Sequence, residues 1–455
     1  MSESDPVTLP AGPSVDAHGR RTLIDHRDYL LSLVEPLTPF GVNLVDAWGL
    51  TLCEDIKADG DLPAQPVAET DGYALCFDDI ATVPPGTRPV LTLAEPPVPA
   101  RAVEEQSWFR RRRTSVPADE QAPVTPQPVL GIGETLPVRT GQALPPGADT
   151  VVAAWQTTAG MSGSRMTVTL HTKVAEGDWV RPVGAEARDG EMLAPLGTLI
   201  TDRMSALLAA AGFDRVMVRP RTRVAVVNVI DSSTDPVGDD GRAPGAGMLM
   251  IIGAAKTDGA TAWRVEIDLA DPMRARERLS DELIRADLML TVGGLGDDAA
   301  DTRLVDLLAD MGVVDVAEVA MRPGRLHGYG LIGDDRTPVI MLPTEPAALL
   351  AAYHAFARSM LRKLMGVEPF VHELVLCFAE HNIEADIDVA QLVPARLKQA
   401  GNRYLANEIM PRRHSQLPAL TEADALVILP GDKRHVYADE ALAAWVLTDK
   451  RSAPR

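Results

Sequence analysis

Cysteine is scarce in this sequence and forms no pattern. The three cysteines, Cys53, Cys76 and Cys377, lie far apart, and none belongs to a C-x-x-C pair. This usage excludes a disulfide framework and a zinc site built from clustered thiolates. We therefore expect a cytoplasmic protein, because the cytoplasm keeps such thiols reduced.

Long apolar runs are also missing. No uninterrupted apolar run reaches the roughly 18 to 20 residues that a membrane-spanning helix needs. The first 21 residues are polar and include Asp5 and Asp16, with no basic patch followed by an apolar stretch. The sequence therefore predicts neither a transmembrane segment nor a secretory signal.

Positive charge is in short supply. The chain has 44 Lys and Arg residues against 64 Asp and Glu residues, which gives a formal net charge of −20. Phosphate backbones repel an acidic protein, so sequence-independent binding to nucleic acid is disfavoured. We expect no nucleic acid partner.

The chain does have enough apolar residues for several cores. Its 455 residues exceed the roughly 250 to 300 residues at which a single core stops growing. Hydrophobic residues make up 46% of the sequence, which excludes a disordered chain. Two to four domains are therefore expected.

Strand and helix patterns alternate in the second half of the chain. Apolar runs with little polar interruption are typical of strands buried on both faces, and the segments between them have helical spacing. Such alternation predicts an α/β domain, a parallel or mixed sheet flanked by helices. The expected strands are Val224–Ile230, Leu288–Val292, Val313–Val319 and Pro338–Leu342, and the expected helices are Pro272–Ala286, Thr302–Met311 and Ala347–Leu364.

The remaining segments have a β-rich pattern. Short apolar runs separated by Pro and Gly turns predict strands up to about residue 200, and the last 90 residues predict a small C-terminal β domain. Two helices are expected in the first half, at Leu23–Leu37 and Met204–Gly212. The predicted fold class is therefore α/β plus β-rich domains.

Residues 94–128 read as an insertion rich in Pro, Glu, Arg and Ala. It contains Trp108–Phe109, followed directly by Arg110–Arg113. One interpretation is a solvated segment whose arginines offset nearby acids such as Glu104 and Glu105. The other is a contact with anionic lipid or with a second partner.

The loops after the expected strands hold the candidate site, because open sheets bind ligands at the carboxyl ends of their strands. Glycines there permit close backbone approach, arginines bind phosphate, and carboxylates hold hard cations or act as acid and base. Together they indicate a phosphorylated ligand with a divalent ion, whereas each element alone also fits a simple turn or a solvated surface. The loops are Ile230–Ser233, Gly293–Asp298, Arg322–Arg325 and Pro343–Pro346.

The order of motifs over about residues 23–450 resembles the MoeA/gephyrin family of molybdopterin molybdenumtransferases. Eight segments match the family's motifs in the same order, which chance does not explain. They are Val45–Leu50 with Leu62–Pro63, Thr70–Ala74, Arg139–Asp149, Gly190–Leu199, Arg223–Pro236, Ala286–Asp301, Arg322–Arg325 and Leu342–Pro346.

The resemblance implies an elongated homodimer with four domains. Their expected bounds are residues 23–58 with 175–218 for a linker and dimerisation domain, 59–174 for a β-rich domain, 219–365 for a molybdopterin-binding-like α/β domain and 366–450 for a C-terminal β domain, after a disordered lead at residues 1–22. Family enzymes cleave adenylylated molybdopterin with a divalent cation and insert molybdate. Mg²⁺ and molybdopterin with molybdate are thus the expected ligands of an active protein, and an inactive one would need no cofactor.

The family's site residues carry over unevenly. By resemblance, the catalytic positions are Asp71, Thr140, Asp231 and Asp301, and Asp231 and Asp301 are also the expected Mg²⁺ ligands. Arg322 and Arg325 stand where the family usually has lysines, which changes a compact ammonium for a planar guanidinium. The expected positions for binding the pterin are Gly141, Gly293, Gly294, Arg322, Pro323, Gly324, Arg325, Pro343 and Pro346.

Several loops depart from the family pattern. Ser232 replaces the Glu expected to act as acid, base or ion ligand, and removing a principal carboxylate typically lowers a rate by about 10²- to 10⁴-fold. Asp298 and Glu345 add negative charge where a phosphate-bearing pterin is expected to bind. The segment Val67–Thr70 lacks the family's Asn and Ser. The pattern indicates a divergent member with altered active-site loops.

Two functions remain open on the sequence. One is an active molybdopterin molybdenumtransferase. The other is a dimeric, gephyrin-like scaffold with weakened or lost catalysis that binds the peptide tail of a partner, as related proteins do in bacterial cell division. Its expected groove lies between the α/β and C-terminal domains, with Tyr353, Arg412, Arg413 and His414 as partner-binding residues. Arg412 and Arg413 are also compatible with solvent-exposed surface residues that bind no partner. Neither His327 nor His414 has a second His or Cys at metal-ligand spacing, so neither is assigned a role.

Overall fold

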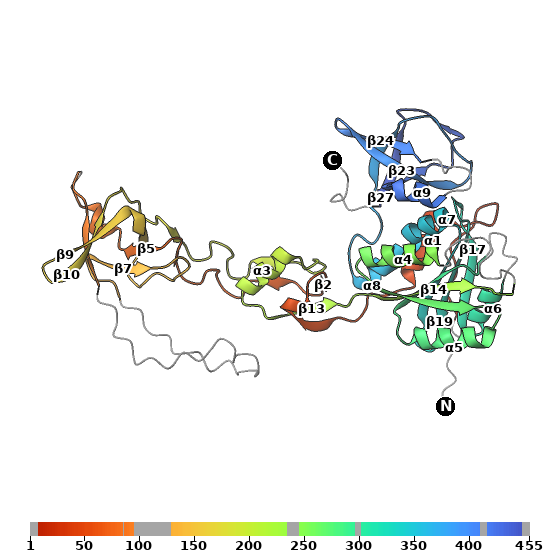
Figure 1. Cartoon of the computed structure of the whole chain (residues 1–455), viewed down its shortest axis with the longest axis horizontal. Coiled ribbons are helices and arrows are strands. Elements are labelled where there is room, and N and C mark those ends of the chain that lie inside the picture. Colours follow the sequence, from red (N-terminus) through yellow and green to blue (C-terminus); the bar gives the residue numbers. More distant parts are fainter. Residues whose placement is uncertain are drawn as a thin grey trace. The chain divides into compact units, whose positions relative to one another are not determined.

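The computed structural model describes residues 8–84, 86–94, 129–233, 245–295, 302–409 and 416–447. The chain divides into two compact units. One unit comprises residues 55–194 and 210–212, and the other comprises the rest of the chain (Figure 1). Trp108–Phe109 and Arg110–Arg113 lie outside the described residues, so their role stays a prediction.

A six-stranded mixed sheet forms the centre of the larger unit, in the order β15-β14-β16-β20-β19-β17. The strands β15, β14, β16 and β20 run parallel, whereas β19 is antiparallel to both its neighbours. The carboxyl ends of β14, β16, β20 and β17 therefore meet at one edge. The bounds are β14 (Arg223–Ile230), β15 (Thr261–Asp268), β16 (Leu288–Val292), β17 (Gly312–Glu318), β19 (Leu326–Ile332) and β20 (Thr337–Leu342).

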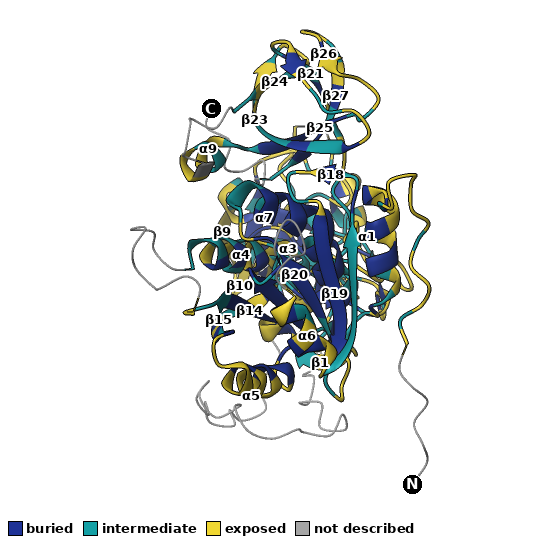
Figure 2. Ribbon diagram, turned by 90° about the vertical axis from the view of Figure 1, so that its right-hand side faces the viewer, coloured by how far each residue is buried: buried dark blue, intermediate teal, exposed yellow. Residues whose placement is uncertain are grey.

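Alternating side chains of these strands supply two hydrophobic cores, one on each face. Val224 and Val226 pack with α1, α4, α7 and α8, whereas Ala225 and Val227 pack with α5 and α6. Figure 1 shows α4 and α8 on one side of the sheet and α5 on the other, and Figure 2 shows strands β19 and β20 as buried. The helices are α1 (Leu23–Ser32), α4 (Ala246–Thr257), α5 (Pro272–Leu283), α6 (Arg303–Ala309), α7 (Pro346–Ala352) and α8 (Arg358–Met365).

All seven elements predicted for this sheet and its helices are present, with ends shifted by a few residues. The sequence did not reveal α4, β15 or β19. The glycines in β19 interrupt its apolar pattern, so the sequence did not indicate a strand there. All seven of its residues are buried. A Cβ atom at Gly328 would lie 2.6 Å from the Met341 side chain, so the neighbouring strand explains the glycine. The predicted helix at Ala347–Leu364 contains a π-helical turn, Tyr353–Ala357, between α7 and α8.

A small three-stranded sheet and a helix belong to the same unit. Its order is β1-β13-β2, all antiparallel. These strands are β1 (Phe40–Asn43), β13 (Arg215–Arg219) and β2 (Thr51–Leu52), with the short helix η1 (Leu44–Asp46) between β1 and β2 and helix α3 (Asp202–Ala210) before β13.

The C-terminal residues form a second six-stranded sheet, in the order β18-β23-β24-β21-β27-β25. Its strand β18 comes from the loop after β17, so the two sheets share one segment of chain. The strands are β18 (Met321–Arg322), β21 (Val375–Ala379), β23 (Ala390–Ala400), β24 (Arg403–Glu408), β25 (Ala425–Leu429) and β27 (Ala441–Val446), with the pair β22 (Ile383–Glu384) and β26 (His435–Val436) and helix α9 (Gln416–Glu422).

The smaller unit is β-rich, as predicted. Its main sheet has the order β8-β5-β7-β6-β10-β9, and two further strand pairs, β11 with β4 and β12 with β3, complete it. The bounds are β3 (Ile56–Lys57), β4 (Val67–Ala68), β5 (Gly72–Leu75), α2 (Asp78–Ala81), β6 (Val90–Leu93), β7 (Glu134–Val138), β8 (Thr150–Ala153), η3 (Ala154–Gln156), β9 (Thr157–Ser162), β10 (Arg165–Leu170), β11 (Val180–Arg181) and β12 (Met192–Ala194).

Two predictions agree with the structure, one from the few cysteines and one from the lack of long apolar runs. All three cysteines are free thiols. Among the described helices, none combines the length and the apolar character required to span a bilayer. The division into four domains at the predicted boundaries stays a prediction.

Candidate functional site

The candidate site lies where the chain reverses direction across the α/β sheet. From β14 the chain passes through α4 to β15 on one side, and then through α5 to β16 on the other side of β14. The loops after β14 and β16 therefore diverge, and such a switch point at the carboxyl edge leaves a crevice for ligands. Three of the predicted loops converge there: Ile230–Ser233, the glycines after β16, and Pro343–Pro346.

Gly293 and Gly294 let the loop after β16 approach its neighbours closely. Both have positive φ values, 92° and 77°, which favour glycine. A Cβ atom at Gly293 would lie 3.1 Å from the Val229 carbonyl oxygen and 3.3 Å from the Thr344 hydroxyl, and one at Gly294 would collide with Leu304. The glycines thus bring the ends of β14, β16 and β20 together. Gly296 and Asp297–Asp301, including the predicted ligand Asp301, lie outside the described residues.

The loop Arg322–Arg325 packs against the start of α7. Gly324 has a φ of 77°, and a Cβ atom there would lie 3.0 Å from Ala348 Cβ and 3.6 Å from Pro343 Cγ. A hydrogen bond of 2.7 Å from the Val319 amide to the Arg325 carbonyl closes the loop at its base. The structure thus brings together the predicted residues Pro323, Gly324, Pro343 and Pro346.

Arg322 makes a contact that the sequence did not predict. Its guanidinium lies 2.8 Å from the carboxylate of Asp386, in the loop between β22 and β23, and Arg322 itself belongs to β18, which pairs with β23. The two side chains are 64% and 46% exposed, so this ion pair is solvent-screened and weak. Arg322 is therefore shared between the candidate site and the C-terminal sheet.

Asp231 is held by an arginine. Its carboxylate lies 2.6 Å from the guanidinium of Arg303 at the start of α6, and it also accepts hydrogen bonds from the amide and hydroxyl of Ser233. Its side chain is only 11% exposed. These partners occupy oxygens of the carboxylate that a ligand would otherwise contact.

Ser232, at the position of the expected family Glu, is bound to another acid. Its hydroxyl donates a 2.6 Å hydrogen bond, and its amide a 3.0 Å one, to the carboxylate of Asp268 at the end of β15. The Ser232 hydroxyl, followed by the amides of Ala270 and Ser232, lowers the pKa of Asp268. The carboxylate that Ser232 lacks is thus present nearby on a different strand.

Glu345 caps the helix that begins at the site. Its carboxylate accepts hydrogen bonds from the amides of Ala347 (3.1 Å) and Ala348 (2.6 Å), and Pro346 follows as the first helical residue. These amides carry the positive end of the helix dipole, which attracts anions. The chain's own carboxylate therefore occupies the amides that would otherwise attract a ligand phosphate.

A cavity of about 770 Å³ opens beside Ser232 and Asp268. Its lining includes Ile230, Ser232, Asp268 and residues along the length of α5. The charged side chains that line it are mainly acidic: Glu266, Asp268, Asp271, Glu277 and Asp281, against Arg274 and Arg278. This balance disfavours an anionic group in that part of the crevice.

Asp71 and Thr140 meet in the smaller unit. The backbone amide of Thr140 donates to Asp71 Oδ1 over 2.8 Å, and its hydroxyl donates over 3.0 Å. These hydrogen bonds, the backbone one first, lower the pKa of Asp71. Gly141 follows in the same exposed turn with a φ of 78°. The three predicted residues therefore form one exposed cluster.

Of the two predicted Mg²⁺ ligands, only Asp231 belongs to the described residues. The described residues contain no cluster of three or more His, Cys, Asp or Glu side chains suited to a metal ion. Asp231 already pairs with Arg303, whose positive charge opposes a divalent cation. We therefore derive no chemical step through a metal at this site.

The predicted peptide groove has one buried member. Tyr353 lies in the π-helical turn with 0% exposure, and its hydroxyl donates a 2.8 Å hydrogen bond to Asp258. Its side chain is therefore part of the core and does not face a peptide in this structure. Arg412, Arg413 and His414 lie outside the described residues, just before α9, which packs against α7.

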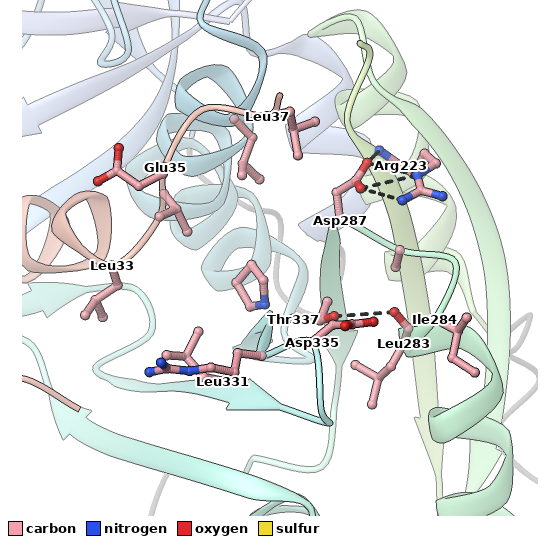
Figure 3. Close-up of a pocket in the computed structure, with 15 residues that line it drawn as sticks. Leu33, Glu35, Leu37, Arg223, Leu283, Ile284, Asp287, Leu331, Asp335 and Thr337 are labelled. Atoms are coloured by element: carbon pink, nitrogen blue, oxygen red, sulfur yellow. Dashed lines mark hydrogen bonds and ion pairs between the residues drawn. The ribbon is translucent and has the colours of Figure 1, made fainter. Parts of the chain in front are cut away.

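A second cavity lies at the opposite edge of the sheet, near the amino ends of β14, β16 and β20 (Figure 3). It measures about 390 Å³ and contains none of the predicted site residues. The Arg223 guanidinium donates to both carboxylate oxygens of Asp287 at its wall, the shortest bond being 2.7 Å. Leu33, Leu37 and Leu283 form apolar parts of the lining.

Sequence reasoning missed Asp268, Arg303 and the capping role of Glu345. Glu345 carried a signal, since an acid directly before a proline at the start of a helical pattern is typical of a helix N-terminus. Asp268 and Arg303 carried none, because only the sheet order and the start of α6 bring them to the loop after β14.

Comparison with known proteins decides the family. Residues 21–212 match the model described as the MoeA N-terminal region, domains I and II. Molybdopterin molybdenumtransferase 1 of Mycobacterium tuberculosis is 27% identical over 424 residues, which cover 88% of this chain and 93% of that protein. The molybdopterin molybdenumtransferase of Bacillus subtilis is 25% identical over 430 residues, which cover 90% of each. Over most of its length the chain is thus similar to MoeA proteins, and residues 21–212 match their N-terminal domains.

The fold agrees with MoeA membership. A crystal structure of the molybdopterin biosynthesis MoeA protein from Pyrococcus horikosii superposes with a TM-score of 0.69 at 19% identity, covering 94% of this chain and 100% of that one. The resemblance found in the eight motifs is thus confirmed, and so is the predicted MoeA-like combination of an α/β domain with β-rich domains.

Proposed function

We propose that this MoeA-family chain acts in molybdenum cofactor biosynthesis. It binds a molybdopterin-type ligand at the carboxyl edge of the α/β sheet, and its molybdenum-insertion chemistry is weaker than that of its relatives. The supporting observation is the convergence of the Gly293, Gly324 and Pro343 loops on a helix start whose amides Glu345 already occupies.

Each of these contacts occupies a hydrogen-bond donor or a positive charge that could otherwise bind an anionic ligand. Glu345 competes with a phosphate for the amides of Ala347 and Ala348. Arg303 is engaged by Asp231, and Arg322 by Asp386. A ligand must break these contacts or bind beside them, so its affinity and its reaction rate are lower than in a site whose cations are unpaired.

The chain is proposed to work as a homodimer in the cytoplasm, with Asp71 and Thr140 of one subunit completing the site of the other. Large apolar side chains exposed on each unit support this: Val45 is 84% exposed and Trp48 62% in the larger unit, and Trp155 is 68% exposed in the smaller one. Large apolar side chains with such exposure are enriched where one protein surface contacts another.

A second candidate function is that of a dimeric scaffold for partner peptides, with a role in bacterial cell division. Helix α9 packs against α7 and exposes Leu417 by 43%, directly after the basic segment Arg412–His414. A basic segment followed in the sequence by an exposed apolar side chain suits an acidic, hydrophobic peptide tail. The weakened ligand site is compatible with this role.

The decisive experiment is a calorimetric titration with molybdopterin, with and without Mg²⁺, beside molybdopterin molybdenumtransferase 1 of Mycobacterium tuberculosis as control. We expect binding that is measurable but weaker than in the control, and little affected by Mg²⁺. If molybdopterin fails to bind while the control binds it, the ligand-binding proposal is wrong and the scaffold function is the one to pursue. Affinity equal to the control would contradict a weakened site.

A further inference from the structure

His327 is buried at the start of an apolar strand, directly after the loop Arg322–Arg325. It is the second residue of β19, all seven residues of which are buried, and it is only 2% exposed. An imidazole in such a place is unfavourable unless its polar atoms have partners. Apolar packing alone therefore does not explain why a histidine stands at this position.

One ring nitrogen of His327 has a partner in the loop. Nε2 lies 3.0 Å from the carbonyl oxygen of Gly324. A carbonyl oxygen only accepts hydrogen bonds, so Nε2 carries the proton and donates. Nδ1 is then an unprotonated acceptor, and it is buried without a hydrogen-bond partner among the described residues. The tautomer follows from this geometry.

Two other rings from distant parts of the chain hold the imidazole in place. Phe356, in the π-helical turn, meets it edge to face, with centroids 4.8 Å apart and an interplanar angle of 73°. His26 of α1 lies 5.9 Å away and itself meets Phe356 edge to face at 5.0 Å. A side chain packed in this way has one rotamer, so the direction of its Nε2–H group is fixed.

The carbonyl that His327 holds belongs to the residue that packs on the helix start. Gly324 touches Ala348, whose amide binds Glu345, and it lies between Arg322 and Arg325. Turning its carbonyl away would move the backbone of the whole loop. The hydrogen bond from His327 therefore sets the orientation of the peptide that joins Gly324 to Arg325.

We propose that His327 is a positioning residue for the ligand site: its Nε2–H group holds the Gly324 carbonyl and thereby fixes the loop Arg322–Arg325 for contact with the phosphate of a bound ligand. This inference rests on the proposed function, because the ligand is the one proposed there. His327 itself touches no ligand and acts through the loop.

The test compares His327→Gln, which keeps an N–H donor at a similar distance, with His327→Leu, which keeps bulk but has no donor. We expect His327→Leu to weaken molybdopterin binding by about fivefold, the typical effect of one neutral hydrogen bond. His327→Gln should stay within about twofold of the wild type. Tyr329→Phe is the matched control, because it alters a buried polar group on the same strand that has no hydrogen-bond partner among the described residues.

Two readouts separate this inference from simple loss of core packing. In the insertion assay, His327→Leu should raise KM and leave kcat nearly unchanged, whereas lost stability alone would lower the active fraction and hence kcat. Equal loss in both variants, or equal loss in Tyr329→Phe, would overturn the positioning role.

A third readout does not depend on the ligand. Nitrogen-15 NMR of histidine-labelled protein should show His327 protonated at Nε2, and hydrogen exchange of residues 322–325 should be faster in His327→Leu than in His327→Gln. If wild-type protein fails to bind molybdopterin but these signals are as expected, the proposed function fails and the loop contact stands. A proton on Nδ1 would refute the contact itself.

Discussion

The carboxylate of Glu345 accepts a 2.6 Å hydrogen bond from the backbone amide of Ala348, so the chain places its own anion on the helix start at its candidate site. A second bond, from Ala347, completes the cap. The same amides are suited to a ligand phosphate. This competition within the chain links the stability of α7 to the affinity of the site.

Replacing Glu345 should therefore change affinity and stability in opposite directions. We expect Glu345→Gly to strengthen molybdopterin binding by about three- to tenfold, because it frees the amides and removes a negative charge. The lost cap should destabilise the protein by about a few tenths of a kcal/mol, because glycine is itself tolerated at a helix N-cap. Calorimetry and urea denaturation measure the two effects. Glu345→Gln keeps an acceptor oxygen without the charge and serves as control. Weaker binding in Glu345→Gly would show that the cap supports the site.

The pair Asp231 and Arg303 predicts how the site responds to a cation. Wild-type protein should bind Mg²⁺ weakly, because the guanidinium 2.6 Å from Asp231 repels it. Arg303→Ala should strengthen Mg²⁺ binding about five- to tenfold, whereas Arg303→Lys, which keeps the charge, should not. Adding Asp231→Asn to Arg303→Ala should remove the gain. Isothermal titration with MgCl₂ measures these affinities, and an unchanged affinity in Arg303→Ala would contradict the repulsion.

Buried histidines predict sensitivity of the larger unit to mild acid. Burial, as the first cause, lowers the pKa to about 3 in His26 and His354, about 4 in His327 and about 2 in His372, from the ordinary 6.5. Each ring is therefore neutral in the folded protein and takes up a proton on unfolding below pH 6.5. Stability is fully present above that pH and is lost as the pH falls towards 4.

Urea denaturation at pH 7.5, 6.0 and 5.0 measures this loss when it is followed by tryptophan fluorescence, to which Trp263 and Trp445 of the larger unit contribute. We expect a falling midpoint below pH 6.5. His372→Phe keeps a ring beside Trp445. Because this variant takes up one proton fewer on unfolding, its free energy of unfolding should fall less steeply as the pH is lowered. A midpoint that stays constant down to pH 5 would be inconsistent with neutral buried rings.

The proposed homodimer predicts a specific sensitivity at Val45. Its side chain is 84% exposed in this chain, so Val45→Glu should leave the fold intact but oppose an apolar interface. By light scattering at micromolar concentration, we expect this variant to be monomeric and the wild-type protein to be dimeric. Ile284→Glu, at a residue of similar exposure (74%) after α5, is the matched control and should stay dimeric. Loss of the dimer in both variants would argue against an interface at Val45.

The sequence by itself determined the family, the fold class and most elements of the α/β sheet. Runs such as Val224–Ile230 and Leu288–Val292 indicate buried strands, because an apolar run with little polar interruption is typical of a strand covered on both faces. The motif order placed Asp71 with Thr140, and the glycines after β16, at turns that need their backbone freedom. These features are local, so each can be read from a few neighbouring residues.

Only the tertiary structure decided which of these residues are available for chemistry. Asp231, Arg322 and Tyr353 were predicted to meet ligands or partners, yet their side chains bind Arg303, Asp386 and Asp258 from other elements. His327 had no pattern to suggest a role until Gly324 and Phe356 were found beside it. Such contacts depend on distances between elements far apart in the chain, and a hydrogen bond or an ion pair forms only when those distances fall within a few tenths of an ångström of its optimum.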